Sequence, residues 1–360
     1  MINQISKKRI SYIDMAKGIG IILVVIGHTE FTSPNLITWI SSFHMPLFFI
    51  ISGILFAHTK VFQKDGKTFI CNKLKTILVP YAFFSVISII ASAILDYDSF
   101  PEDLVISLLQ TVSFNGIAVL WFLPALFLSE AIFFRLTKHT SSRIIIVSVL
   151  AISVFSIIGN ELYHRFYTIT GEYLNLLINY MITVMIRTGI AISFLAIGYY
   201  AYRLFLVKIL QRGIYWILAG ASLALNLCTG LSNCRVDLNQ LVLGNYILYY
   251  LAAFFGSMCV ICICRALPDI RPLIYVGENS LIIMVTHGNC RFLGICYAIG
   301  RLAVSALPIL GKIGYIVIVI IVMIGLEVIA ITLINRYMPF LIGRNKKIIK
   351  KVEIGKRNVL

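Results

Sequence analysis

Long apolar segments alternate with short polar segments along nearly the whole chain. A helix that crosses a membrane needs about 20 mostly apolar residues, and ten segments come close to that length. The pattern therefore predicts about ten transmembrane helices. They lie near residues 14–31, 36–57, 77–95, 117–135, 144–159, 176–202, 213–229, 242–264, 273–299 and 313–335.

The composition supports lipid as the surrounding solvent. Of the 360 residues, 59% are hydrophobic and 13% are charged, whereas soluble domains are roughly 45–50% apolar and about 25% charged. A soluble core cannot bury this much apolar surface. No linker or internal repeat is visible, so we expect an all-α polytopic protein with one membrane domain, residues 1–345, and a basic cytoplasmic tail, residues 346–360.

The net charge of +16 comes from basic residues clustered between the apolar segments. No recognition helix or basic aromatic platform accompanies them, so we expect no nucleic-acid partner. Most of the 31 basic residues fall in alternate connections, including Lys60, Lys64, Lys67, Lys73 and Lys75 after the second span. Because cytoplasmic loops are enriched in Lys and Arg, this distribution predicts that both termini are cytoplasmic, in a bacterial inner membrane.

Ionisable side chains inside spans are costly, so each is a hypothesis about function. The predicted spans contain His28, His44, Glu130, Arg187, His287 and Arg291. If the first span is helical, Lys17 lies roughly 16 Å from His28 along its axis, with the lysine at the cytoplasmic end. By the same counting His44 and His287 reach a depth similar to that of His28, which predicts a shared polar cavity.

Neutral imidazole is well matched to accepting a proton near neutral pH. We therefore take His28, His44 and His287 as candidate catalytic residues, although His44 could equally hydrogen-bond a neighbouring helix. Arg187 and Arg291 are candidates for stabilising an oxyanion or contacting substrate. A simpler explanation for arginines inside predicted spans is that each pairs with an acidic residue of another helix, for example Glu130 or Glu327.

Other familiar sites are missing or weak in the sequence. The segment with Cys259, Cys262 and Cys264 could bind a metal, but no histidine is near, and thiols facing lipid or core explain it better. We expect no metal. Neither a Gly-x-Ser-x-Gly elbow, nor a zinc-binding His-Glu-x-x-His, nor a phosphate loop is present, so any chemistry must use the membrane histidines.

Several segments resemble the acyltransferase family 3 membrane proteins, which include O-antigen acetylases and fucose 4-O-acetylase-like proteins. These segments cover about the first 130 residues and the region near 272–290, and their order and spacing are more specific than any one alone. They are Tyr12–Gly18 continuing to Val25–His28, Ser42–Gly53, Leu78–Tyr81, Leu120–Leu126, and Gly277–Leu281 continuing to His287.

The resemblance implies about ten helices, an acyl-CoA donor bound from the cytoplasm, and transfer of an acyl group, acetyl in the simplest case, to a carbohydrate or glycolipid hydroxyl. It also implies a cation eleven residues before the first histidine, usually arginine and here Lys17. Lysine keeps the charge but lacks the two-pronged guanidinium. Lys73 and Lys75 are further candidates for the CoA phosphates, and topology explains them equally well. His28 would act as a base or carry the acyl group itself.

Two other function classes are open at this point. Some members of the family that this sequence resembles are associated with polysaccharide export or small-molecule transport. A transporter of the same fold is therefore the main alternative. Transporters often contain matching repeats with broken helices, which the sequence does not display. A non-catalytic partner in glycan assembly is the third. The sequence does not identify the acceptor sugar, the acyl chain or the oligomeric state.

Overall fold

The computed structural model describes residues 10–95, 100–166, 173–207, 210–290 and 292–344. Throughout these ranges the regular structure is helical, apart from one isolated antiparallel bridge between Asp237 and Val242. The predicted all-α class is confirmed. The predicted tail, residues 346–360, lies outside the described residues.

The helices group into two compact units, and each is described by itself. The first comprises Met1–Asp65, Leu128–Thr168 and Met185–Ser280. Its helices are α1 (Ser11–Gly27), α2 (Pro34–Ser41), α3 (His44–His58), the larger part of α7 (Phe122–His139), α8 (Ser142–Phe166), the end of α9 (Tyr173–Ala201), α10 (Arg212–Leu231), α11 (Tyr246–Ala266) and α12 (Arg271–Glu278), with short turns at Val61–Gln63 and Tyr202–Leu206.

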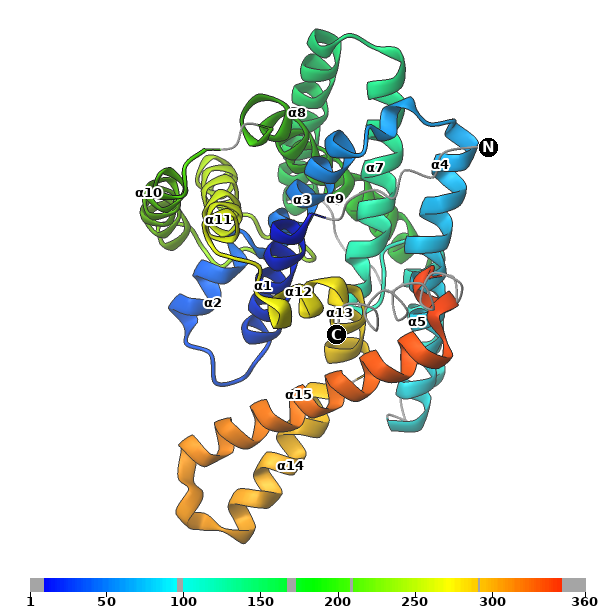
Figure 1. Cartoon of the computed structure of the whole chain (residues 1–360). Coiled ribbons are helices and arrows are strands. Elements are labelled where there is room, and N and C mark those ends of the chain that lie inside the picture. Colours follow the sequence, from blue (N-terminus) through cyan, green and yellow to red (C-terminus); the bar gives the residue numbers. More distant parts are fainter. Residues whose placement is uncertain (1–9, 96–99, 167–172, 208–209, 291, 345–360) are drawn as a thin grey trace, which may run out of the picture. The chain divides into compact units, whose positions relative to one another are not determined.

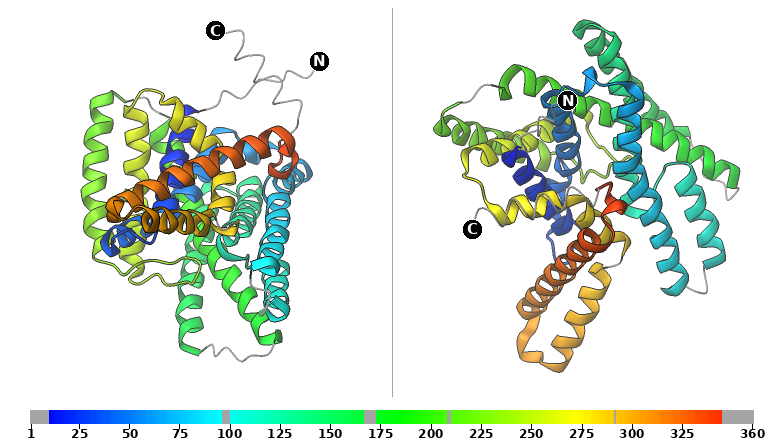
Figure 2. Two further views of the ribbon diagram at one scale, coloured as in Figure 1. Left: turned by 90° about the horizontal axis from the view of Figure 1, so that it is seen from below. Right: turned by 45° about the vertical axis from the view of Figure 1, so that its right-hand side comes forward.

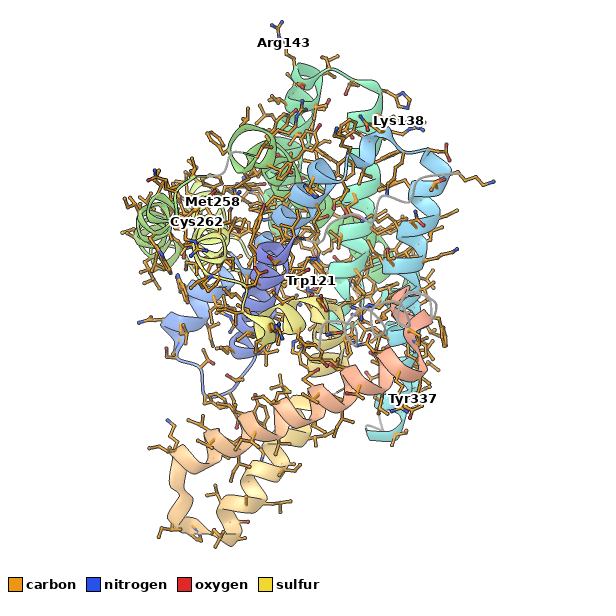
Figure 3. All side chains as sticks on the ribbon, viewed as in Figure 1. Trp121, Lys138, Arg143, Met258, Cys262 and Tyr337 are labelled. Carbon is orange, nitrogen blue, oxygen red and sulfur yellow. The ribbon has the colours of Figure 1, made fainter. Side chains whose placement is uncertain are left out.

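Within the first unit, α10 and α11 run side by side (Figures 1 and 2). Tyr215 and Ala219 of α10 pack on Cys262 and Ala266 of α11, and Met258 joins them. Figure 3 shows Met258 and Cys262 on α11. The thiol of Cys262 is therefore part of the packing between two helices, as expected for a core cysteine.

The second unit comprises Gly66–Phe127, Ile169–Val184 and Leu281–Leu360. In it, α14 and α15 form an antiparallel hairpin (Figure 2). Its helices are α4 (Gly66–Lys73), a π-helical turn Leu74–Leu78, α5 (Val79–Leu95), α6 (Phe100–Val112), a short turn Ala118–Trp121, the first turns of α7 and α9, α13 (Ser280–Asn289), α14 (Phe292–Ala306), α15 (Gly311–Tyr337), and turns at Pro308–Leu310 and Pro339–Ile342.

Eight described helical segments are long and apolar enough to cross a membrane. Several expose large apolar side chains: Phe155 of α8 is 75% exposed, and Ile217 of α10 is 72% exposed. Faces of this kind are costly in water and favourable in lipid, where a helix satisfies its own backbone hydrogen bonds. The chain is thus a multi-pass membrane protein, as the apolar pattern predicted. Which termini face the cytoplasm stays a prediction.

Two predicted spans have a more complex structure. The segment predicted at 36–57 consists of α2 and α3, which are separated by Ser42 and Phe43. The segment predicted at 273–299 is divided among α12, α13 and α14, with a 62° bend between α13 and α14. The break between those two helices includes Arg291, which lies outside the described residues. The segment predicted as the first span contains α1, which has 17 residues and is about 25 Å long.

Two glycines let α3 and α9 approach closely. A Cβ atom on Gly53 would lie 1.9 Å from the Leu195 carbonyl oxygen, and one on Gly198 would lie 2.0 Å from the Ile50 carbonyl oxygen. Membrane helices use small residues for such backbone contact because hydrophobic association between helices is weak in lipid. The contact fixes α3, the helix that begins with His44.

We expect Gly198→Ala to destabilise the protein by about 1–3 kcal/mol, because the added methyl group must push the Ile50 backbone away. The measurement is thermal unfolding in detergent, followed with a thiol-reactive dye that reports exposure of the buried cysteines. Gly220→Ala on α10 is the matched control, since nothing lies within 4 Å of its added Cβ. Equal unfolding midpoints for the two variants would contradict the prediction.

Candidate active site

His28 lies at the C-terminal end of α1, where helix carbonyls lack partners from the next turn. Its Nδ1 is 2.8 Å from the carbonyl oxygen of Val24. The Ile26 carbonyl accepts hydrogen bonds from the hydroxyls of Thr29, at 2.8 Å, and Thr32, at 2.7 Å. The side chains that follow α1 therefore cap it, and this capping orients the imidazole. The His28 side chain is exposed.

His44 is the first residue of α3 and has the same relation to the end of α2. Its Nδ1 is 2.8 Å from the Ile40 carbonyl oxygen. The neighbouring carbonyls of Thr38 and Trp39 accept hydrogen bonds from the Ser41 and Ser42 hydroxyls. The carbonyls at the end of α2 are thus bonded by the residues that follow, and the Ile40 carbonyl accepts both the Phe43 N–H and the His44 imidazole.

Long-range contacts hold this break in place. Phe43 is 1% exposed and packs where a Cβ on Gly256 of α11 would lie, 2.4 Å from its Cγ. The indole N–H of Trp39 donates to Asn226 Oδ1 of α10 at 2.6 Å, and the Asn226 amide donates to the Ala252 carbonyl at 2.9 Å. Three helices therefore fix the position from which His44 projects.

The hydrogen bonds of the two histidines determine which ring nitrogen carries the proton. A carbonyl oxygen can only accept, so Nδ1 is the donor in each bond. In the neutral ring, Nε2 then holds the lone pair and can accept a proton or a hydrogen bond. In the neutral form of His28 and of His44, Nε2 is therefore the unprotonated ring nitrogen.

Two ionisable residues interact electrostatically with His44. His44 lies close enough to His28 and to Asp237 for electrostatic interaction with both, and Asp237 also interacts with Arg187. Arg187 of α9 is 4% exposed and its guanidinium donates to the Asn239 carbonyl. Arg187 thus binds the connection that follows α10, and a common site for His28, His44 and Arg187 stays a prediction.

Asp237 was missed because it lies in the connection between α10 and α11, which we had assigned to an outer loop and the start of a span. The connection contains apolar residues that the structure buries, at 5% exposure or less. In the sequence, apolar and polar residues alternate along this connection, and that pattern could have indicated a packed loop. The buried residues are Val236, Leu238, Leu241 and Leu243.

Near the other end of α1, the Lys17 ammonium lies 3.4 Å from the carboxylate of Asp14, which is buried. The guanidinium of Arg265 lies 4.9 Å from the ring centroids of both Tyr12 and Tyr215. From the sequence, Arg265 was counted only among the basic residues that predict which loops are cytoplasmic. Cations therefore gather at the end of α1 away from His28.

A pocket of about 360 Å³ lies at the end of α3 away from His44. It is lined by His58, Thr59, Lys60, Gln63 and Lys64. On the other face of α3, the Ser52 hydroxyl donates to Glu130 of α7, whose side chain is buried. Glu130, which we weighed as a partner for an arginine, thus contacts the helix of His44.

The second unit contains the remaining described candidates. His287 of α13 is fully buried, and its Nδ1 is 2.8 Å from the Ile283 carbonyl oxygen. The neighbouring Thr286 hydroxyl donates to the carboxylate of Glu327 on α15, at 2.8 and 3.0 Å. Lys73 ends α4 with its ammonium 5.9 Å from the Phe69 ring centroid, and Lys75 is exposed in the following π-helical turn. A cavity shared by all three histidines stays a prediction.

Within the described residues, no group of three or more His, Cys, Asp or Glu side chains could hold a metal ion. Cys259, Cys262 and Cys264 are buried free thiols.

Comparison with known proteins gives one family and one curated relative. A family model described as an acyltransferase domain matches residues 10–332. Nodulation protein NolL of Mesorhizobium japonicum is 32% identical over 152 residues, which are 39% of this chain and 39% of that protein. The match thus spans about two fifths of the relative's length. No solved structure matches.

Proposed function

The chain belongs to this acyltransferase family, and from that premise we propose that it is an O-acyltransferase of the bacterial inner membrane. In this proposal it moves an acyl group, acetyl in the simplest case, from cytoplasmic acyl-CoA to a hydroxyl of a surface carbohydrate or glycolipid. The observation that carries the proposal is the pair of imidazoles, His28 and His44, each of which donates through Nδ1 to a main-chain carbonyl and so has its basic lone pair on Nε2.

The donor binds from the end of α1 that carries Lys17. Because α1 is helical from Ser11 to Gly27, the backbone of Lys17 is about 16 Å from that of His28. An extended pantetheine arm along this helix brings the thioester toward His28 while the phosphates stay among cations. Asp14 pairs with Lys17, so an incoming phosphate competes with a carboxylate for this ammonium. Lys73 and Lys75 are further phosphate contacts in the proposal.

The chemistry needs a base and a place for the acceptor. His28 Nε2 takes the proton of the acceptor hydroxyl as its oxygen attacks the thioester carbonyl. The tetrahedral oxyanion then expels the CoA thiolate, which takes the proton from the imidazolium, and the products are the ester and free CoA. His44 Nε2 accepts a hydrogen bond from a second acceptor hydroxyl, an arrangement suited to a carbohydrate. His287 remains a candidate for a further contact.

Membranes containing the wild-type protein are expected to transfer radiolabel from [¹⁴C]acetyl-CoA to envelope carbohydrate or glycolipid. The product is measured after alkaline release of ester-linked acetate, which separates O-acyl from N-acyl groups. Membranes from the same host without the protein are the control. If label in the ester fraction does not exceed that control with acetyl-, propionyl- or succinyl-CoA, the proposed function is wrong.

A further inference from the structure

The hairpin of α14 and α15 (Figures 1 and 2) carries an open pocket of about 370 Å³ at its tip. This volume falls within the range of small-molecule sites, about 300–1,000 Å³. The pocket belongs wholly to the second unit. It is lined by residues at the end of α14 and at the start of α15, namely Arg301, Val304, Ser305, Gly311, Lys312 and Tyr315.

Close contact between the two helices fixes one side of the pocket. A Cβ atom on Gly300 would lie 2.8 Å from Cε2 of Tyr315 and 2.9 Å from Cγ2 of Val319, so α14 and α15 touch beside the pocket. At Gly311, which begins α15 with a φ of +54°, nothing lies within 4 Å of an added Cβ. The hairpin is therefore tightly packed on one side of the pocket and open on the other.

Arg301 and Lys312 give this pocket a positive charge that no carboxylate balances. The sequence contains no Asp or Glu between Glu278 and Glu327, and neither cation forms an ion pair with another described residue. Lys312 is the second residue of α15, where the helix macrodipole disfavours a cation. Because the two charges stabilise neither each other nor the helix, an anion bound between them would be favourable.

The place of these cations along the chain is also unusual. The distribution of basic residues that predicts cytoplasmic termini puts the α14–α15 connection on the outer side, where Lys and Arg are depleted. In that topology four basic residues fall in outer connections, namely Arg165, Arg235, Arg301 and Lys312. The last two line the same pocket. Topology therefore does not explain why both are there.

The surface around the pocket is apolar. Ile309, in the turn between the two helices, is 94% exposed, and Ile313 in the first turn of α15 is 78% exposed. Leu302, next to Arg301, is exposed as well. A soluble anion in the pocket would leave these side chains uncovered, whereas the acyl chains of a lipid would cover them.

We propose that this pocket binds the phosphate headgroup of an anionic membrane lipid. Arg301 and Lys312 contact the phosphate, and the acyl chains lie along Leu302 and Ile313. A guanidinium suits this ligand because its planar fork can donate two hydrogen bonds to phosphate oxygens, and basic pockets between membrane helices recognise anionic headgroups. The inference does not depend on acyl transfer, and it gives the α14–α15 hairpin a binding role of its own.

The test measures binding of phosphatidylglycerol, labelled with a fluorophore on one acyl chain, to the full-length protein in nonionic detergent micelles by fluorescence anisotropy. We expect Arg301→Gln/Lys312→Gln to raise the Kd roughly tenfold or more, because each basic residue near an anionic headgroup adds to the affinity. The matched control is Arg165→Gln/Arg235→Gln, which removes the same charge from two exposed arginines of the first unit. It is expected to leave the Kd within about twofold of wild type.

Equal weakening by the two double variants overturns the inference, because general surface charge then explains the binding. Wild-type protein that does not bind the labelled lipid overturns it too, and so does phosphatidylcholine that competes as well as unlabelled phosphatidylglycerol. Inorganic phosphate and glycerophosphoglycerol, the same headgroup without acyl chains, are the remaining competitors. Displacement by either at the concentration at which unlabelled lipid competes shows a site for a soluble anion and overturns the assignment to a lipid.

A second variant covers the case in which the double variant does not accumulate in membranes. Ser305 lines the pocket, and its hydroxyl donates to the Leu302 carbonyl at 2.8 Å. Ser305→Glu places a carboxylate beside the two cations and leaves both of them in place. We expect it to weaken binding of phosphatidylglycerol as the double variant does, and an unchanged Kd overturns the inference.

Discussion

His28→Asn is expected to lower the rate of acyl transfer by about 10²- to 10⁴-fold, the range for removing a general base. The asparagine amide nitrogen occupies nearly the position of Nδ1, so it keeps the hydrogen bond to the Val24 carbonyl that His28 makes. What the variant lacks is the Nε2 lone pair. The end of α1 stays capped, and the loss of rate then reports the base rather than a damaged helix.

The matched control for this substitution is His139→Asn, an exposed histidine in the last turn of α7. Initial rates of ester-linked label are compared at equal protein content in membranes, with the thermal unfolding midpoint measured for each variant. Full transfer by His28→Asn, with an unchanged midpoint, would falsify the assignment of His28 as the base.

His44→Asn is expected to raise the KM for the acceptor about tenfold and to change kcat less. The variant keeps the hydrogen bond that His44 makes to the Ile40 carbonyl, so the break between α2 and α3 is preserved. It removes the acceptor for a second hydroxyl, and losing one hydrogen bond to a substrate costs about 1–1.5 kcal/mol. If the lost hydrogen bond stabilises the bound substrate and the transition state equally, its removal raises KM and leaves kcat nearly unchanged.

This experiment needs a defined acceptor, so it uses the glycan or glycolipid fraction that wild-type membranes label, added at graded concentrations. Phe43→Leu provides a comparison, because it disturbs the same break through packing and leaves the imidazole in place. If His44→Asn instead loses kcat as strongly as His28→Asn at saturating acceptor, His44 takes part in the chemical step and the division of roles proposed here is incorrect.

The helices follow from local features of the sequence. Apolar segments of about 20 residues predict helical spans because a backbone in lipid must satisfy its own hydrogen bonds, which few structures other than a helix allow. Lys17 and His28, eleven positions apart, are placed relative to each other by the geometry of one helix. The polytopic all-α fold and the family were both predicted from such local patterns, and both are confirmed. They carry little information about which spans meet.

The features that were not predicted depend on contacts between distant residues. The break at Phe43 lies in a continuous apolar segment and is set by Gly256, Trp39 and Asn226. Asp237 is brought beside Arg187 by a turn that other helices hold. A single sequence shows the apolar and polar residues of that turn, but only the packed unit determines which of them is buried and which contacts Arg187.

The placement of Lys17 and His28 on one uninterrupted helix has a consequence for how this protein can vary. Each residue inserted between them would add about 1.5 Å and turn the histidine about 100° around the axis. In the proposed mechanism, a single insertion or deletion would thus misalign the donor and the base, whereas a substitution that keeps the helical register would leave them aligned. If the proposed donor path along α1 is correct, we expect changes in acyl-chain preference to arise in residues that pack against α1 and not in the length of α1.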